Sequence, residues 1–323
     1  MSDSSAHPLG GQTSVRANQA ARITKISDMP LGIQKGLLNA FPEMNAFSIL
    51  NDGGGGLVVQ TTRNVATSSR ESDKSDFSAI KIRDVTDPEV RNAFEQEIRH
   101  SQIVDHPHAI KTLSSKIVEQ YGFHEMEYAA GGTLSKRLSE DWLPQDLVLL
   151  GVAIGSVLGE IHKSGYAYLD CKPQNIVIGS KNVPKLLDYG LMRPVAGLDS
   201  YHFIAGTSDY AAPECVRPGR PGTPIDVYSL AVTLLVVAAG HHSWRRPNYP
   251  ALTRYGPADL SNVPQPRVTF PPSIAECLSR ALQHDPEART RDGESFAMEL
   301  VAAAQDVWGP HWSEDSSLTL HRD

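Results

Sequence analysis

The residues best suited to chemistry lie in a short polar stretch, residues 168–175, with the sequence Tyr-Leu-Asp-Cys-Lys-Pro-Gln-Asn. It contains Asp170, Lys172 and Asn175, and Asp188 follows Asp170 by 18 residues as the first residue of an Asp-Tyr-Gly triplet. Phosphoryl transfer uses such a set, in which one carboxylate orients the attacking hydroxyl and a lysine neutralises the moving group. An Asn and a second Asp then hold magnesium. The spacing therefore predicts phosphoryl transfer.

The composition limits the classes of protein to which the chain can belong. Its 323 residues are 40% hydrophobic, which is enough for the core of one two-lobed unit or of two small domains. A net charge of −7 argues against a surface that coats nucleic acid. Cys171, Cys215 and Cys277 are odd in number and widely spaced, which favours a reducing setting over a disulfide framework or a zinc site. The longest apolar run, residues 227–239, is too short to span a bilayer.

A run of four glycines follows a strand-like pattern that begins at Ala46. The glycines are Gly53, Gly54, Gly55 and Gly56. Such a run lets a backbone turn approach a polyphosphate closely, although by itself it is more typical of a flexible linker. A short alternating strand over residues 77–82 follows and carries Lys81, which alone would be an ordinary solvated charge at a sheet edge.

Further motifs follow one another in an order that points to a family. Residues 126–129 are Met-Glu-Tyr-Ala, residues 206–214 are Gly-Thr-Ser-Asp-Tyr-Ala-Ala-Pro-Glu, and residues 285–289 are Asp-Pro-Glu-Ala-Arg. With the polar stretch and the Asp-Tyr-Gly triplet, this series resembles the eukaryotic-like (Hanks-type) Ser/Thr protein kinase catalytic domain over about residues 45–305. The resemblance implies an α+β fold with two lobes, a small β-rich N-lobe with one main helix and a larger, mainly helical C-lobe.

The resemblance also implies roles for the polar residues. Asp170 is the expected base that orients the acceptor hydroxyl, and Lys172 is the expected cation beside the phosphoryl group. Asn175 and Asp188 are the expected magnesium ligands. Thr207 is expected to contact the catalytic Asp and Lys, which favours Ser or Thr over Tyr as the acceptor.

Two residues of the N-terminal half complete the expected catalytic set. Lys81 resembles the lysine that clasps the α- and β-phosphates. A helical pattern over residues 88–104 carries Glu97 nine residues before a His-Pro pair, the offset of the glutamate that pairs with this lysine in the family. Glu95 is the nearest competitor, and without the resemblance either glutamate would be an ordinary exposed helix charge.

The expected nucleotide site combines backbone groups with apolar side chains. The glycine run would contact the phosphates, Met126 would be the gatekeeper, and the backbone of Glu127 and Ala129 would hydrogen-bond adenine. Three apolar residues would sandwich the ring: Val58, Ala79 and Val177. The resemblance thus implies ATP and Mg²⁺ as cofactors, with Mn²⁺ as an alternative metal.

Other matched residues are expected to hold the helical lobe together. Asp226 opens the apolar run and is expected to anchor the backbone of the catalytic loop, and Glu214 is expected to pair with Arg289. Tyr168 and Tyr189 replace the usual His and Phe, which keeps aromatic bulk and adds two hydroxyls.

Three departures from the family pattern keep other functions open. Asn51 replaces the first glycine of the loop, and Ser101 occupies a place where an apolar residue usually links the lobes. Leu169 replaces the usual arginine (a non-RD kinase), so switching by phosphorylation of the activation loop is not expected. A pseudokinase that binds nucleotide or a partner without catalysis is the main alternative. A kinase-fold small-molecule phosphotransferase and a purely structural interaction module are the others.

The sequence divides into a leader, a domain and a tail. The predicted parts are a disordered or partly helical leader at 1–44, a kinase domain at 45–308 with its N-lobe at 45–126, hinge at 127–132 and C-lobe at 133–308, and a tail at 309–323. The leader could contain a short helix over residues 31–41, with Ile33, Leu37 and Leu38 on one side. The tail residues 314–317, Glu-Asp-Ser-Ser, are expected to be solvated and self-phosphorylated.

Partners and location follow from these expectations. Proteins with Ser or Thr acceptors are the expected substrates, and neither nucleic-acid binding nor a membrane span is expected. Cytoplasmic location is favoured, with export through the Ser-rich, acid-poor leader as the alternative. The sequence does not indicate an oligomeric state.

Overall fold

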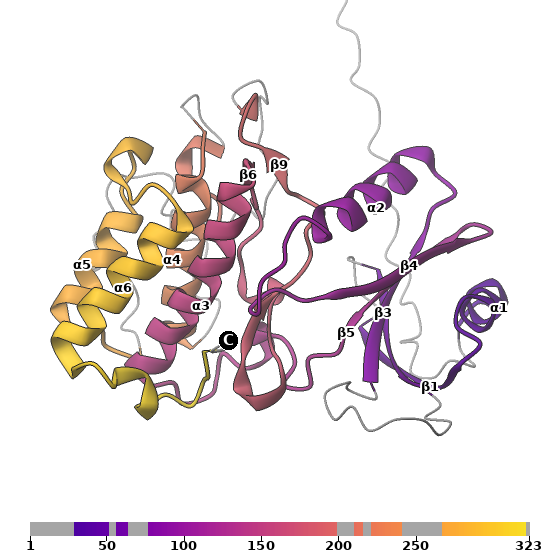
Figure 1. Cartoon of the computed structure of the whole chain (residues 1–323), viewed down its shortest axis with the longest axis horizontal. Coiled ribbons are helices and arrows are strands. Elements are labelled where there is room, and N and C mark those ends of the chain that lie inside the picture. The colour runs from indigo at the N-terminus through magenta and orange to yellow at the C-terminus, as the bar shows by residue number, and fades with distance from the viewer. Residues whose placement is uncertain are drawn as a thin grey trace, which may run out of the picture.

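The computed structural model describes residues 29–51, 56–63, 77–198, 210–215, 221–240 and 267–320. These residues form a small lobe built on an antiparallel sheet and a larger lobe built mainly of helices, as Figure 1 shows. The two-lobed α+β architecture that the resemblance implied is therefore confirmed.

The N-lobe is built on a five-stranded sheet with the order β1-β2-β3-β5-β4, in which every paired neighbour is antiparallel. Its strands are β1 (Met44–Asn51), β2 (Leu57–Arg63), β3 (Phe77–Asp84), β4 (Thr112–Val118) and β5 (Tyr121–Glu127). The register places Lys81 of β3 between Val58 of β2 and His124 of β5. This register brings the expected phosphate-binding lysine beside a histidine that the motifs did not single out.

A helix that lies within the predicted leader packs on this sheet. Helix α1 (Leu31–Ala40) buries Leu37, and the chain then buries Phe41, whose ring meets Phe123 of β5 edge-on at 6.2 Å between centroids. Burying a side chain such as leucine contributes about 1.5 to 3 kcal/mol. Leu38, expected on the apolar side, is instead 58% exposed. Helix α1 thus packs its buried residues in one apolar cluster with residues of the sheet, although the sequence placed it in the leader.

Helix α2 (Pro88–Ser101) crosses the other side of the sheet, next to β4 (Figure 1). Asp87 caps its N-terminus by accepting a hydrogen bond from the Glu89 backbone N–H at 2.7 Å. Phe94 and Ile98 point inward and are buried, which fixes the rotation of the helix about its axis. Glu97, which lies between Phe94 and Ile98 in the sequence, is directed toward Lys81 of β3.

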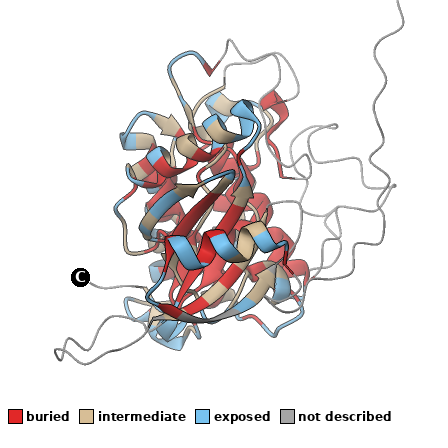
Figure 2. Ribbon diagram, turned by 90° about the vertical axis from the view of Figure 1, so that its right-hand side faces the viewer, coloured by how far each residue is buried: buried red, intermediate tan, exposed pale blue. Residues whose placement is uncertain are grey.

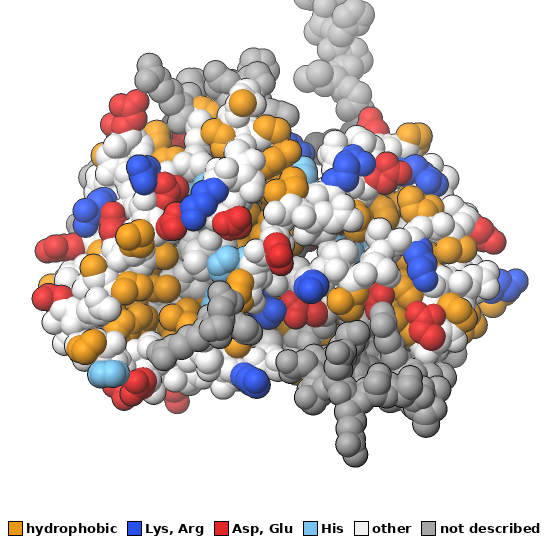
Figure 3. All heavy atoms as spheres, in the orientation of Figure 1, with side chains coloured by type: hydrophobic (Ala, Val, Ile, Leu, Met, Phe, Trp, Pro, Cys, Tyr) orange, Lys and Arg blue, Asp and Glu red, His pale blue; other side chains and the backbone are white. Residues whose placement is uncertain are grey.

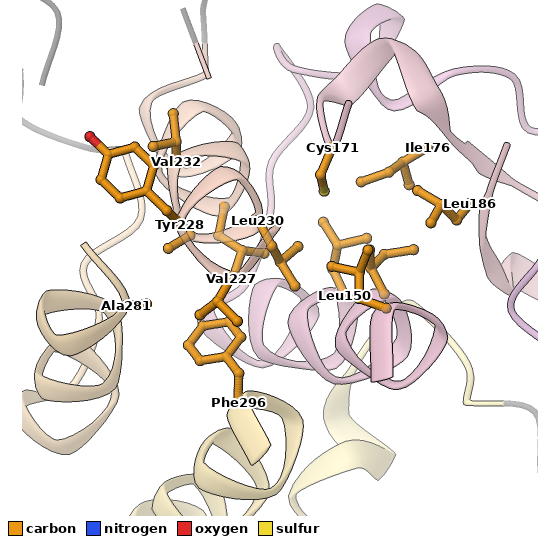
Figure 4. Close-up of a cluster of buried hydrophobic side chains, with 14 of the residues drawn as sticks. Leu150, Cys171, Ile176, Leu186, Val227, Tyr228, Leu230, Val232, Ala281 and Phe296 are labelled. Carbon is orange, nitrogen blue, oxygen red and sulfur yellow. The ribbon is translucent and has the colours of Figure 1, made fainter. Parts of the chain in front are cut away.

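The C-lobe is organised around two long apolar helices, α3 and α4. Its helices are α3 (Pro144–Lys163), α4 (Pro224–Ala239), α5 (Pro272–Ala281) and α6 (Gly293–Trp308). Helices α3 and α6 pack closely where Gly155 faces Gly293, since a Cβ on Gly293 would lie 2.5 Å from the Gly155 carbonyl oxygen. Figure 4 shows side chains from α3, α4 and α6 meeting in the core, with Cys171 pointing into it. All three cysteines are buried and free.

Short elements between α3 and α4 shape the site. Two small two-stranded sheets pair β6 (Tyr166–Ala167) with β9 (Arg193–Pro194) and β7 (Ile176–Ile178) with β8 (Pro184–Leu186). The 3₁₀ turns are η2 (Leu134–Lys136), η3 (Pro173–Asn175), η4 (Ser180–Asn182), η6 (Pro213–Cys215), η9 (Pro286–Ala288) and η10 (Trp312–Asp315). Figure 2 shows that burial concentrates in the strands and the inner helix faces.

The predicted tail packs against the C-lobe. Trp312 and Leu318 are buried with the C-lobe core. Buried Asp146 in the first turn of α3 accepts hydrogen bonds through Oδ1 from the Ser316 hydroxyl at 2.8 Å and the Ser317 backbone N–H at 2.6 Å. The expectation of a solvated tail therefore does not hold for Ser316, because a buried carboxylate takes up its hydroxyl.

Among the described residues one helix, α3, is long and apolar enough to cross a membrane by length and composition alone. In this structure 72% of its most apolar window is buried inside the protein. Its apolar residues therefore serve the C-lobe core described above.

Candidate active site

A buried aspartate at the start of α4 holds the catalytic loop. Asp226 Oδ2 accepts a hydrogen bond from the Tyr168 backbone N–H at 2.6 Å, and Oδ1 accepts one from the Leu169 backbone N–H at 2.7 Å. His162 Nε2 lies 2.9 Å from Asp226 Oδ2. Leu169 adopts φ 71°, a left-handed conformation that non-glycine residues seldom adopt. The chain therefore turns sharply just before Asp170.

Asp170 is tied to the two polar residues that follow it in the loop. Lys172 Nζ donates to both carboxylate oxygens of Asp170, at 2.8 and 2.7 Å. Asn175 Nδ2 donates to the Asp170 backbone carbonyl at 2.9 Å and to its Oδ2 at 2.7 Å. The structure thus brings together the expected base, its neighbouring cation and one expected metal ligand, with Asp170 buried and Lys172 partly exposed.

The second expected metal ligand closes the site from the other side. Asp188 follows β8 and adopts φ 67°. The preceding Leu187 donates its backbone N–H to the Asn175 carbonyl at 3.0 Å, which fixes this segment against the catalytic loop. Lys81 Nζ then donates to Asp188 Oδ2 at 3.1 Å, across 107 residues of sequence. This ion pair joins the two lobes at the site.

Lys81 also pairs with the glutamate predicted for it. Lys81 Nζ donates to Glu97 Oε1 at 2.6 Å, and both side chains are at least nine-tenths buried. The competitor, Glu95, is half-exposed and approaches Arg99 at 3.8 Å. The structure therefore selects Glu97 over Glu95.

The pKa of Glu97 shows how strongly its surroundings favour the ionised form. Burial raises the pKa, but His124, Lys81 and Arg83 together outweigh burial and lower it from 4.5 to about 2. The Arg83 guanidinium lies 3.6 Å from Glu97 Oε2, and His124 Nδ1 lies 3.8 Å from Oε1. Glu97 is consequently a carboxylate at all physiological pH values.

The hinge and the apolar residues expected around adenine also lie together. Val58 is half-buried in β2, Ala79 is buried in β3, and Met126 stands opposite Ala79 at the end of β5. Backbone hydrogen bonds join the last two hinge residues, Gly131 and Gly132, to Ile178 of β7. Thr133, the next residue, forms an antiparallel bridge with Val177, which holds Val177 next to the hinge. Ala129 is half-buried, and within the described part of the chain its backbone N–H has no acceptor. An N–H in this position suits a heterocycle acceptor.

Glu127 contributes side-chain contacts in addition to its backbone. Its Oε1 accepts from Lys185 Nζ at 2.7 Å and from the Lys111 backbone N–H at 2.9 Å. These bonds link the hinge to β8 and to the start of β4, so the hinge is braced on both lobes.

Part of the predicted site falls outside the described residues. Gly53, Gly54, Gly55 and Thr207 belong to this group. Gly56 is described and has φ 105°, and a Cβ there would lie 3.0 Å from the Ile82 carbonyl oxygen. Glycine is required at this position for both reasons.

The chemistry of the donor set fits a divalent magnesium ion. Because the Asn175 amide nitrogen donates to Asp170, the amide oxygen is the atom left to meet a cation, and Asp188 supplies a partly exposed carboxylate. Magnesium is usually held by one or two such protein groups together with substrate phosphates. Within the described ranges no cluster of three His, Cys, Asp or Glu residues could hold a metal by itself.

Comparison with known proteins gives the family. Residues 60–302, more than half of the chain, match the protein kinase domain. The chain belongs to the protein kinase family. This kinase domain is 30% identical over 200 residues to serine/threonine-protein kinase PknL of Mycobacterium tuberculosis, covering 60% of this chain and 50% of PknL.

Two further relatives are also serine/threonine-protein kinases. Serine/threonine-protein kinase Pkn3 of Myxococcus xanthus is 27% identical over 249 residues, covering 70% of this chain and 45% of Pkn3. Serine/threonine-protein kinase ULK3 of Xenopus laevis is 28% identical over 205 residues, covering 62% of this chain and 44% of ULK3. The chain spans about half the length of these relatives.

The two tyrosines that depart from the family pattern pack against each other in this kinase domain. The rings of Tyr168 and Tyr189 meet edge-on, with 6.1 Å between centroids. Tyr168 donates its hydroxyl to the Leu187 carbonyl at 2.5 Å, and Tyr189 donates to the Leu186 carbonyl at 3.1 Å. His100 Nδ1 of α2 lies 3.0 Å from the Tyr189 carbonyl oxygen. The added hydroxyls therefore bind backbone, and α2 contacts the Asp-Tyr-Gly turn directly.

Sequence reasoning missed three residues that surround the two buried carboxylates. His162 approaches Asp226, and Arg83 and His124 approach Glu97. None of them belongs to a motif used above, and His124 reaches the site only through the pairing of β3 with β5. The position of Arg83, two residues after Lys81 on the same strand and hence on the same face, is the one signal that the sequence offered.

Proposed function

We propose that this chain transfers the γ-phosphoryl group of ATP to Ser and Thr hydroxyls of proteins, itself included. The observation that carries the proposal is the continuous set of contacts from Glu97 through Lys81 to Asp188, facing the Asp170, Lys172 and Asn175 cluster. Phosphoryl transfer needs positioning and charge neutralisation more than covalent chemistry, and this set supplies both.

Each residue has a defined task in this proposal. Asp170 accepts a hydrogen bond from the acceptor hydroxyl and takes its proton as transfer proceeds. Lys172, whose ammonium lies at Asp170, neutralises charge on the moving group. Lys81 binds the nucleotide phosphates while Glu97 holds it in place. Asn175 and Asp188 would hold magnesium, which neutralises phosphate charge when bound.

The choice of Ser and Thr acceptors is supported by the names of the relatives, which are serine/threonine-protein kinases. The predicted contact of Thr207 with the catalytic residues agrees with this choice. Leu169 is buried rather than presenting a cation, so control by activation-loop phosphorylation is not part of the proposal.

Protein substrates and a cytoplasmic location complete the proposal. Figure 3 shows Lys and Arg side chains interspersed with Asp and Glu on one face of the molecule, without the basic stripe that nucleic-acid binding favours. Free, buried cysteines suit a reducing compartment. Export through the N-terminal residues remains the alternative, which fractionation of cells expressing tagged full-length chain would reveal.

Two substitutions test the catalytic assignment. Asp170→Asn and Lys81→Met should each reduce phosphate transfer to a generic basic protein by at least about a thousandfold while the circular dichroism spectrum is unchanged. Phosphoamino-acid analysis should show phosphoserine or phosphothreonine. Full transfer by folded Asp170→Asn would refute the assignment of the base, and label found only on small acceptors would favour a small-molecule phosphotransferase.

A further inference from the structure

Three polar side chains form a hydrogen-bonded network that ends beside the Lys81–Glu97 pair. It begins at Ser101, the last residue of α2, passes through Thr112 at the start of β4 and ends at His124 of β5. Thr112 Oγ1 lies 2.8 Å from Ser101 Oγ and 2.9 Å from His124 Nε2. Ser101 and His124 are buried, although serine and histidine usually keep contact with water.

The direction of each hydrogen bond in this network is fixed by proton count. Ser101 donates its single hydroxyl proton to the Ile98 carbonyl oxygen at 2.8 Å, so its oxygen can only accept from Thr112. Thr112 then has no proton left for His124 and must accept from it. His124 Nε2 therefore carries a proton, and the ring is held by that nitrogen.

The other ring nitrogen faces the catalytic glutamate. His124 Nδ1 is buried 3.8 Å from Glu97 Oε1, and no hydrogen-bond partner for it lies within the described residues. Glu97 Oε2 is likewise buried and lacks a hydrogen bond there, with Arg83 at 3.6 Å. An unpaired buried polar atom costs free energy, and here two such atoms belong to neighbouring side chains, which indicates a functional arrangement.

We propose that His124, locked by Thr112 and Ser101, is a positioning residue that keeps Glu97 directed at Lys81. The inference rests on the proposed function, since it concerns the same reaction. The hydrogen bonds tie the end of α2 to β4 and β5. They start from Ser101, at the position where the family usually has an apolar residue that links the lobes. The edge of the His124 ring then occupies the space beside Glu97 Oε1. The carboxylate is thereby confined to the side where Lys81 and Arg83 lie.

The same strands provide a matched control on the opposite face of the sheet. Successive residues of β5 point to opposite faces, so Glu125 points away from His124. Buried Glu125 accepts from the hydroxyls of Ser78 at 3.0 Å and Ser114 at 2.7 Å. An irregularity in the pairing of β4 between Thr112 and Ser114 lets the two residues serve different faces. Ser114→Ala therefore removes a comparable hydrogen bond and leaves the hydrogen bonds among Ser101, Thr112 and His124 in place.

The test compares four variants of the full chain: Thr112→Val, Thr112→Ser, His124→Phe and Ser114→Ala. Thr112→Val and His124→Phe should lower kcat for phosphate transfer about tenfold, with a smaller change in KM for ATP. Thr112→Ser and Ser114→Ala should stay within about twofold of the wild type. Hydrogen exchange of the α2 backbone should quicken in Thr112→Val and not in Ser114→Ala, whereas the thermal midpoints of these two variants should fall alike.

The outcomes separate positioning from general stability. The proposal is overturned if Thr112→Val keeps wild-type kcat and α2 exchange, or if Ser114→Ala loses as much activity as Thr112→Val. If His124→Phe fails to fold, comparison of kcat between Thr112→Val and Thr112→Ser still tests the proposal. If the wild type transfers no phosphate, the proposed function fails. Hydrogen exchange of the α2 backbone then tests by itself whether the Ser101, Thr112 and His124 hydrogen bonds hold the helix that carries Glu97.

Discussion

Two buried carboxylates fix key parts of the active site: Asp226 fixes the catalytic loop of the C-lobe, and Glu97 fixes Lys81 of the N-lobe. The two carboxylates have different kinds of partners. Asp226 in the C-lobe is bound by two backbone N–H groups and lies beside His162, so both of its oxygens have a partner. Glu97 in the N-lobe has one oxygen on Lys81, while the other has Arg83 nearby and no hydrogen bond within the described ranges. The first is fixed by backbone and the second by side chains alone.

This difference indicates which half of the site can adjust. Backbone donors move only if the loop itself moves, so Asp226 fixes the shape of the catalytic loop. The groups around Glu97 are two long cationic side chains from β3 and the His124 ring from β5, which can change partners without unfolding a strand. The catalytic loop is therefore a rigid platform, and the position of Glu97 is the variable part.

The largest effect on stability is expected at the rigid carboxylate. In Asp226→Asn the amide NH₂ would face a backbone N–H of Tyr168 or Leu169, leaving buried donors opposed. We expect the free energy of unfolding to fall by about 3 kcal/mol, measured by urea denaturation. Asp306→Asn, at an exposed position of α6, is the control and should be neutral. A neutral Asp226→Asn would show that the two carboxylates are not held differently.

The contribution of ionised Glu97 to the free energy of unfolding should be lost at acid pH. Its pKa is about 2 in the folded protein against an ordinary value of 4.5, so the ionised group stabilises the fold above pH 4.5 and this stabilisation is lost as the pH falls toward 2. Between pH 6 and pH 3 the wild type should lose about 2 kcal/mol more of its unfolding free energy than Glu97→Gln. Equal losses in urea melts of the two proteins would contradict the role of Glu97. Glu95→Gln, at a half-exposed position of the same helix, is the control and should behave as the wild type.

A smaller effect is expected from the second cation. Arg83→Gln should raise the pKa of Glu97 and lower the free energy of unfolding at pH 6 by about 0.5 to 1 kcal/mol, because Arg83 is partly exposed and lies 3.6 Å away. Phosphate transfer should fall a fewfold. Arg99→Gln removes an exposed guanidinium that lies 3.8 Å from half-exposed Glu95, and it serves as the control. An effect of Arg83→Gln as large as that of Lys81→Met would mean that Arg83, not Lys81, is the principal partner of Glu97.

The sequence was sufficient where function is carried by short local motifs. Asp170, Lys172 and Asn175 lie within six residues, and the turn they occupy follows from their order. Lys81 and Glu97 could be paired because the family fixes the offset of the glutamate from a His-Pro pair. The structure brings all five into contacts that agree with these expectations.

Features that depend on packing between distant segments could not be predicted in this way. The contribution of α1 depends on Phe41 meeting Phe123, 82 residues later in the chain, and composition alone placed this helix in a leader. The docking of Ser316 depends on Asp146, 170 residues earlier. The Ser101, Thr112 and His124 network depends on strand register, which alternation patterns do not specify without knowledge of the partner strand.

One measurement tests the central claim most directly: transfer of radiolabelled γ-phosphate from Mg-ATP by the purified full chain, to itself and to a generic basic protein, beside Asp188→Asn. The account predicts label on both acceptors with the wild type and at least about a thousandfold less with the variant. Absence of label from the wild type, with ATP still bound in a thermal-shift assay, would contradict it and indicate a pseudokinase.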